Sequence, residues 1–152
     1  MTAAGYRALN DELNRLKSVD RPKIINEVEI ARAHGDLREN AEYHAAREKY
    51  GFIEGRISAL ADKIATAQVI NISELSGEKV IFGATVVLED INAGDEVRYQ
   101  IVGEDESDVK QGRISYLSPL ARSLLGKEAG DEVEVRAPGG TKTYEILRVE
   151  FK

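Results

Sequence analysis

The chain has 152 residues, 42% of them hydrophobic, which is enough for one or two small domains, and its lack of cysteine excludes disulfide bonds, thiolate zinc sites and cysteine nucleophiles. Its 27 acidic residues exceed its 21 basic ones, so the net charge of −6 excludes the broad positive field that supports autonomous nucleic-acid binding. No apolar run reaches the roughly 18 residues of a membrane helix and no secretory signal pattern is present, so we expect a cytoplasmic protein without a membrane partner.

The first predicted domain, residues 1–75, consists of two long helices. Apolar residues recur at spacings of three and four along residues 6–16 and again along residues 50–67. In an antiparallel pair of helices, the residue numbers of facing positions add up to a constant. The apolar residues of the two segments meet this condition, which predicts a coiled-coil hairpin. The pairs that sum to 73 are Leu9 with Ile64, Leu13 with Leu60 and Leu16 with Ile57, and those that sum to 74 are Ile24 with Tyr50, Val28 with Ala46 and Ala31 with Tyr43.

The first helix is predicted to be interrupted near residue 20. Asp20 falls where the apolar seam needs a hydrophobic residue, and Pro22 has no N–H to donate to the preceding turn. We therefore expect a kink or a restart there.

The turn segment, residues 35–42, carries an excess of acids. Gly35 can end the first helix, Asp36 can cap the next one, and Glu39 at the third position completes a capping box. Glu42 adds a third acid, more than a cap requires. The other interpretation is metal chemistry, because Mg²⁺ takes one or two protein carboxylates and leaves its other positions to water and phosphate.

The second predicted domain, residues 76–152, follows a linker at residues 71–78 and has the two-residue period of strands. Five strands are expected at residues 79–90, 95–103, 110–117, 131–140 and 141–151. One short helix interrupts them, with Ser118 as N-cap, Pro119 at its first position and Gly126 after its end. The predicted fold class is α+β: a helical hairpin followed by a small, mostly antiparallel sheet with one short helix.

Several long motifs resemble those of the Gre family of bacterial transcript cleavage factors. They are ARAHGDLRENAEYHAAREKYGFIEGRI (residues 31–57), AQVI (67–70), VIFGATV (80–86), SPLARSLLGKEAGDEVEV (118–135) and APGG (137–140). The resemblance covers essentially the whole chain. It implies an N-terminal antiparallel coiled coil and a C-terminal domain similar in fold to FK506-binding proteins.

The resemblance also implies a function and its residues. The hairpin enters the secondary channel of RNA polymerase, and Asp36 and Glu39 help the polymerase to hold a catalytic Mg²⁺ that cleaves the 3′ end of backtracked nascent RNA. Arg32, Arg38 and Arg47 resemble a basic patch that guides this RNA end, and Ser118, Pro119 and Arg122 are expected to contact the rim of the channel. The chain is then a monomer and not itself an enzyme.

Other interpretations remain open at this point. The chain can be a plug that blocks the channel without promoting cleavage, or a coiled-coil adaptor whose turn acids only cap a helix. Each arginine can instead pair with an acid on its own helix, and Tyr43 can serve packing rather than base stacking. A zinc site with His34 and His44 is disfavoured because structural zinc normally needs four ligands. A prolyl isomerase is disfavoured because fold does not carry function and the domain has few aromatic residues.

Overall fold

The computed structural model describes residues 1–35 and 40–152, and it divides into two compact units. One unit is the helical hairpin, residues 6–67, and the other combines residues 1–5 with residues 68–152. None of the helices in these described ranges is both long and apolar enough to cross a membrane.

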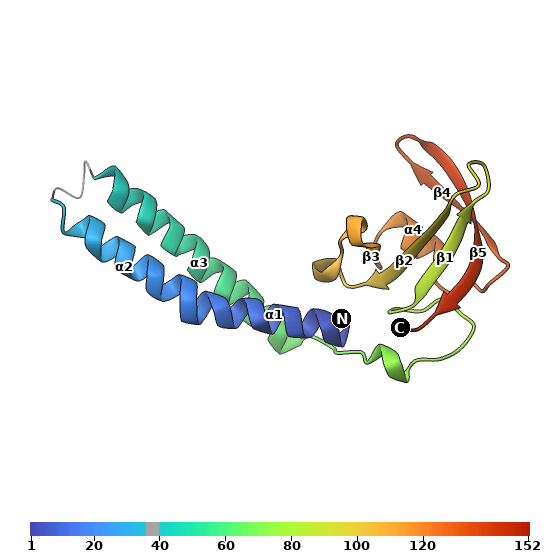
Figure 1. Ribbon diagram of the computed structural model, residues 1–152, viewed down its shortest axis with the longest axis horizontal. Helices are drawn as coiled ribbons and strands as arrows, with labels where there is room; N and C mark the ends of the chain where they lie inside the picture. Colours follow the sequence, from blue (N-terminus) through green and yellow to red (C-terminus); the bar gives the residue numbers. More distant parts are fainter. Residues whose placement is uncertain (36–39) are drawn as a thin grey trace. The chain divides into compact units, whose positions relative to one another are not determined.

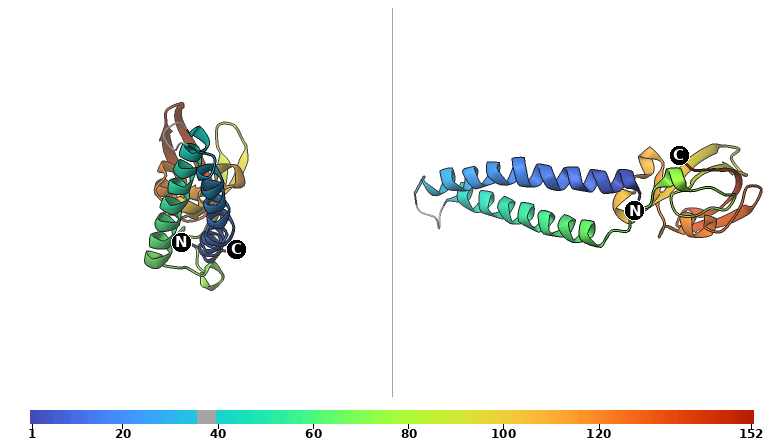
Figure 2. Two further views of the ribbon diagram at one scale, coloured as in Figure 1. Left: turned by 90° about the vertical axis from the view of Figure 1, so that its left-hand side faces the viewer. Right: turned by 90° about the horizontal axis from the view of Figure 1, so that it is seen from below.

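Two antiparallel helical arms form the hairpin unit (Figure 1). The first arm comprises α1 (Ala3–Arg15), a π-helical turn η1 (Leu16–Asp20) and α2 (Arg21–Arg32), and the second is the single helix α3 (Ala41–Thr66). Figure 2 shows α2 and α3 side by side from a second direction. At about 1.5 Å per residue, the 26 residues of α3 extend about 39 Å.

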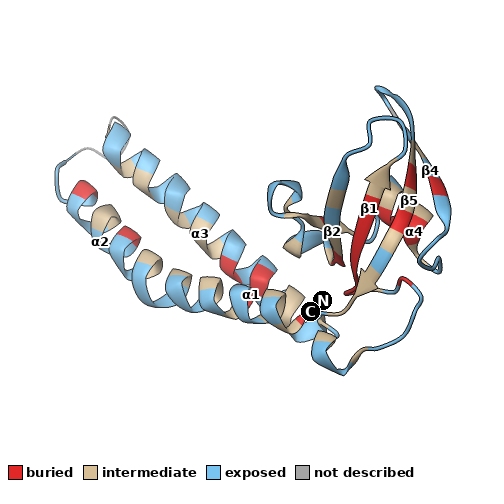
Figure 3. Cartoon of the chain, turned by 45° about the vertical axis from the view of Figure 1, so that its right-hand side comes forward, coloured by how far each residue is buried: buried red, intermediate tan, exposed pale blue. Residues whose placement is uncertain are grey.

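The apolar seam between the arms consists of the residues predicted for it. Leu9, Ile24, Ala31, Ile57 and Leu60 are buried, and the other predicted seam residues are half-buried (Figure 3). Ion pairs lie beside the seam: the Arg21 guanidinium donates to both carboxylate oxygens of Glu54, at 2.7 and 3.0 Å, and Arg56 does the same to Glu12, at 2.9 and 3.0 Å. The seam therefore holds the hairpin together by apolar packing, with charged pairs at its margins.

The predicted interruption of the first arm is confirmed as a change in hydrogen bonding. Pro22 cannot donate a backbone hydrogen bond, and the N–H of Arg21 donates to the carbonyl of Leu16, five residues back instead of four. Asp20 is half-buried at this point. The arm continues as α2 with Pro22 in its first turn, the part of a helix where proline is best tolerated.

Two glycines on the exposed side of α3 are sites where alanine is expected to increase stability. A β-carbon added at Gly51 or Gly55 meets no atom within 4 Å, and helix propensity favours alanine over glycine. We expect Gly51→Ala and Gly55→Ala each to raise the free energy of unfolding by about 0.5–1 kcal/mol in chemical denaturation. Gly83→Ala is the contrasting control, because Gly83 has φ +90° and should lose stability. A loss on replacing Gly51 or Gly55 would contradict the open helix surface.

The pair between Glu12 and Arg56 predicts a pH dependence of hairpin stability. The hydrogen bonds from Arg56 lower the pKa of Glu12 below its ordinary 4.5, against a smaller opposing effect of burial. Because the folded pKa is lower than the unfolded one, the stabilisation is present above about pH 4.5 and is lost as the pH falls through the folded pKa. Thermal melts should show Glu12→Gln less stable than the parent near pH 6, by at most about 1 kcal/mol, and the difference should shrink as the pH falls below about 4.5. A difference that persists at low pH would refute the assignment.

A five-stranded mixed sheet forms the other unit, in the order β3-β2-β1-β5-β4. The strands are β1 (Thr85–Asp90), β2 (Glu96–Val102), β3 (Arg113–Ser115), β4 (Glu132–Ala137) and β5 (Gly140–Glu150). All neighbours are antiparallel except β2 and β3, which are parallel. Single-turn 3-10 helices occupy connections: η2 (Ile72–Glu74), η3 (Glu104–Glu106) and η4 (Val109–Gln111).

The five predicted strands and the short helix are present, with differences at the start of β1 and at both ends of β3, which covers only three of the eight residues expected for it. Residues 79–84 were expected to be strand, but this segment instead forms backbone hydrogen bonds with the residues that follow α4 (Pro119–Leu124). The N–H of Val80 donates to the carbonyl of Lys127, and the carbonyl of Val80 accepts from the N–H of Gly126, both at 2.8 Å. The positive φ of Gly83 then turns the chain into β1. The sheet curls around α4 (Figure 1). Their apolar faces form a core that includes Leu88, Ile101, Leu124 and Ile146, all at most 1% exposed.

Residues 1–5 join the sheet unit through contacts that no local pattern indicates. Thr2 bridges to Ile70, and the carboxylate of Glu106 accepts hydrogen bonds from the backbone N–H of Thr2 at 3.0 Å, from the Thr2 hydroxyl, and from the N–H of Gly103 at 2.8 Å. Gly5 leaves room for this carboxylate, because a β-carbon at residue 5 would collide with it.

Candidate functional site

The candidate site lies at the end of the hairpin where α2 leads into the turn segment. The last turn of α2 closes with the N–H of Ala33 donating to Glu29 at 3.1 Å, and Gly35 has φ +128°, a backbone region that favours glycine. Three of the predicted functional residues, Asp36, Arg38 and Glu39, lie outside the described residues. Their assigned roles therefore stay predictions.

The capping interpretation of the acids is wrong for α3, because this helix begins later than expected. Its N-cap is Asn40, whose side-chain oxygen accepts from the N–H of Tyr43 at 3.0 Å while its amide donates to the carbonyl of Ala31. Asparagine caps as well as aspartate, so α3 has its cap without Asp36, and a capping box would place its acid at residue 43 and not at Glu39. Glu42 is in the first turn of α3, as predicted, where it favours the helix dipole.

One groove between α2 and α3, which we call the tyrosine groove, brings predicted RNA-contacting residues together. It has a volume of about 380 Å³ and is lined by Ile25, Val28, Glu29, Arg32, Tyr43, Arg47 and Tyr50. Arg32 and Arg47 are exposed, whereas Tyr43 and Tyr50 are half-buried. Within residues 1–35 and 40–152, neither of these guanidinium groups pairs with a carboxylate, so the alternative that helix acids neutralise them finds no support there.

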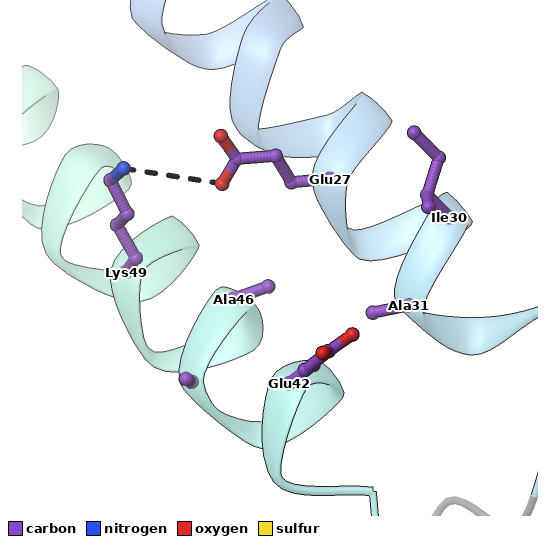
Figure 4. Close-up of a pocket in the computed structure, with 7 residues that line it drawn as sticks. Glu27, Ile30, Ala31, Glu42, Ala46 and Lys49 are labelled. Atoms are coloured by element: carbon purple, nitrogen blue, oxygen red, sulfur yellow. Dashed lines mark ion pairs between the residues drawn. The ribbon is translucent and has the colours of Figure 1, made fainter. Parts of the chain in front are cut away.

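A second groove of about 400 Å³, which we call the glutamate groove, is also formed by α2 and α3 and has a different character. Its lining residues are Glu27, Ile30, Ala31, Glu42, Ala45, Ala46 and Lys49. Figure 4 shows Lys49 pointing toward Glu27, with 4.0 Å between the ammonium nitrogen and the carboxylate. Two Glu and one Lys give this groove a formal charge of −1, whereas two Arg and one Glu give the tyrosine groove +1.

The described part of the chain offers no metal centre of its own. It contains no group of three or more His, Asp or Glu side chains that could hold an ion. The ring of His44 instead lies edge-on to that of Tyr43, with 5.7 Å between the ring centres, and His34 is exposed just before the turn.

The predicted rim-contacting residues lie at the start of α4. Ser118 is the N-cap, its hydroxyl accepting from the N–H of Ala121 at 3.2 Å, and Pro119 and Arg122 are exposed. Sequence reasoning missed the apolar surface just before them: Tyr116 and Leu117 are each 42% exposed. The ring of Tyr116 packs edge-on against Phe82, with 5.9 Å between the ring centres. The two-residue period marked Tyr116 and Leu117 as strand, but β3 ends at Ser115.

Comparison with known proteins identifies the family. A model of the "Transcription elongation factor, N-terminal" family matches residues 1–69, and a model described as "Transcription elongation factor, GreA/GreB, C-term" matches residues 75–151. The chain belongs to the GreA/GreB family of transcription elongation factors.

Relatives within the GreA/GreB family match over the full length of the chain. Transcription elongation factor GreA of Phenylobacterium zucineum (strain HLK1) is 61% identical over 151 residues, covering 99% of this chain and 96% of the relative. GreA of Hyphomonas neptunium (strain ATCC 15444) is 61% identical over 152 residues, covering 100% and 97%. Among solved structures, the GreA factor homolog 1 (Gfh1) protein of Thermus thermophilus is 27% identical, with a TM-score of 0.44 over 99% of this chain and 97% of that one.

Proposed function

We propose that this elongation factor rescues backtracked RNA polymerase by promoting cleavage of the 3′ end of the nascent RNA. The hairpin enters the secondary channel of the polymerase in the cytoplasm, and Asp36 and Glu39 act in the polymerase active site. The observation that carries this proposal is that Asn40 caps α3, which leaves these two acids without a role in capping that helix. Family membership supports the same function.

The dimensions of the hairpin suit a probe that acts at a distance. An arm of about 39 Å can carry a turn segment deep into another protein while the sheet unit remains outside. The buried seam stiffens the hairpin, because the two arms pack against each other through it, and a stiff hairpin can position its turn segment.

The turn acids have the donor chemistry that Mg²⁺ requires. Carboxylate oxygens are hard ligands, and Mg²⁺ typically takes one or two of them and retains water or phosphate at its other positions. When held between the polymerase and this chain, the ion supplies charge stabilisation at the reacting phosphate. Asp36 and Glu39 would hold the ion together with the polymerase, and their carboxylate oxygens would accept hydrogen bonds from the attacking water. We propose that the chain alone is not an enzyme, because the polymerase supplies the remaining ligands.

The proposal gives the sheet unit a docking role. Ser118, Pro119 and Arg122 present the start of α4 to the rim of the channel, and the exposed Tyr116 and Leu117 add apolar surface beside it. A single copy of the chain suffices, since one hairpin fills one channel.

The test is a defined backtracked elongation complex incubated with the purified chain and Mg²⁺. We expect shortening of the labelled RNA 3′ end followed by resumed elongation, and no cleavage of free RNA by the chain alone. Binding to the complex with inhibition and no shortening would instead identify a plug. Cleavage of free RNA would contradict an active site shared with the polymerase.

A further inference from the structure

The tyrosine groove has the features of a small single-stranded RNA site. Tyr43 and Tyr50 are seven residues apart on one face of α3, with Arg47 between them and Arg32 opposite on α2. Two helical turns separate the tyrosines by about 10 Å, roughly three times the 3.4 Å rise of a stacked nucleotide. Aromatic rings and cationic groups in one groove are the combination with which proteins bind single strands independently of sequence.

The charge of the groove favours a phosphate backbone. Its two guanidinium groups are exposed and have no carboxylate partner among the described residues, so a ligand does not have to break an ion pair with any of these residues to reach them. The carboxylate of Glu29 is also in the lining and reduces the net charge to +1. The glutamate groove, formed by the same two helices, has a net charge of −1 and no aromatic side chain.

The burial of the tyrosines is also consistent with this use. Both side chains are half-buried and both line the groove, and the ring of Tyr43 is further restrained by its edge-on contact with His44. A restrained ring loses little conformational freedom when a base stacks on it. Packing in the seam and stacking in the groove are therefore compatible roles for the same side chain.

We propose that Tyr43 and Tyr50 stack on bases of a short single-stranded RNA lying along the tyrosine groove, while Arg32 and Arg47 bind its phosphates. The proposal rests on the proposed function, in which an RNA 3′ end meets the hairpin, and it adds the face of the hairpin that the RNA follows. The glutamate groove stays free of RNA.

The first experiment measures RNA binding without polymerase. The full chain is titrated into a short fluorescein-labelled single-stranded RNA at low ionic strength, and anisotropy reports binding. We expect Tyr50→Leu to weaken binding on the order of tenfold and Tyr50→Phe to retain it, because phenylalanine keeps the stacking ring. Tyr43→Leu and Tyr43→Phe should behave in the same way. Thermal melts identify any variant that has lost its fold. If a leucine variant is unfolded, the phenylalanine variant at the same position still tests whether the aromatic ring is sufficient for RNA binding.

Matched charge variants test the choice of groove. Arg47→Gln should weaken binding and reduce the slope of affinity against salt by about one, whereas Lys49→Gln, two residues away in the glutamate groove, should change neither. A duplex of the same length should bind more weakly, because its bases are not available for stacking. Equal losses for Arg47→Gln and Lys49→Gln, or full affinity in a folded Tyr50→Leu variant, would overturn the proposal.

The second experiment places 4-thiouridine at the RNA 3′ end of a backtracked elongation complex. Photo-crosslinks to this chain should map to residues 43–50 on the tyrosine-groove side and should fall in yield for folded Tyr50→Leu. Crosslinks that map to the glutamate groove overturn the assignment even if cleavage proceeds. If the parent chain promotes no cleavage, the proposed function is wrong. The titration with free RNA then still tests whether the tyrosine groove binds RNA.

Discussion

Asp36→Asn is expected to lower the rate of RNA cleavage in backtracked complexes by at least about 100-fold. Changing residues that merely support metal ligands typically costs 10- to 100-fold, and a direct ligand should cost no less. The helix should be unaffected, because Asn40 and not Asp36 caps α3. The measurement is the rate of 3′-end shortening at several Mg²⁺ concentrations, where the variant should need more Mg²⁺ than the parent.

Glu42→Gln provides the matched control for this prediction. It removes one negative charge from the first turn of α3, close in sequence to the proposed ligands, and should leave the cleavage rate within about twofold because the remaining helix–dipole effect is small. Unchanged cleavage by Asp36→Asn, at the parent's Mg²⁺ dependence, would remove the ligand role. Equal losses in both variants would point to general negative charge rather than to coordination.

Leu60→Ala is expected to destabilise the hairpin by about 2–5 kcal/mol. Leu60 is 0% exposed in the seam, so truncation leaves a cavity that two packed helices cannot readily close. Urea denaturation followed by far-UV circular dichroism should show the loss in the transition that removes most of the helical signal.

Ser58→Ala is the control for the core substitution. Ser58 is on the exposed side of α3, two residues from Leu60, and its replacement should change stability by less than about 0.5 kcal/mol. If Leu60→Ala unfolded at the same denaturant concentration as Ser58→Ala, the seam would not be the source of hairpin stability.

The predictable parts of the fold are those encoded by local periodicity. The seam could be paired residue by residue because its apolar side chains repeat every three or four positions, and the sums of 73 and 74 follow from an antiparallel arrangement. The α4 helix was equally readable, since Ser118, Pro119 and Gly126 each mark a defined cap position.

The errors arose where two local signals competed. Asp36 and Asn40 are both good N-caps, and the capping box with Glu39 favoured the first, whereas the structure uses Asn40. The amide of Asn40 can both accept from Tyr43 and donate to Ala31 across the hairpin, which a carboxylate cannot do. Sequence spacing did not reveal this second contact because it joins residues from different helices.

Contacts between distant residues were beyond sequence reasoning. Glu106 and Thr2 are 104 residues apart, and neither belongs to a motif, yet the carboxylate of one receives the hydroxyl and N–H of the other. The tyrosine groove was missed for a related reason. Periodicity assigned Tyr43 and Tyr50 to the seam, which is correct, but only the packed helices show that part of each side chain also lines a cavity with Arg32 and Arg47.

The π-helical turn η1 keeps the apolar residues of the first arm on the seam, although this arm has one residue more than its partner over the same stretch. In the pairing predicted from the sequence, the first arm advances eight residues from Leu16 to Ile24, while its partner advances only seven from Ile57 to Tyr50. The widened turn at Leu16–Asp20 absorbs the odd residue; in an unbroken α-helix every side chain beyond it would be rotated by about 100° away from its partner. Deletion of one residue from this turn, such as the exposed Val19, is therefore the deletion that the first arm should tolerate best.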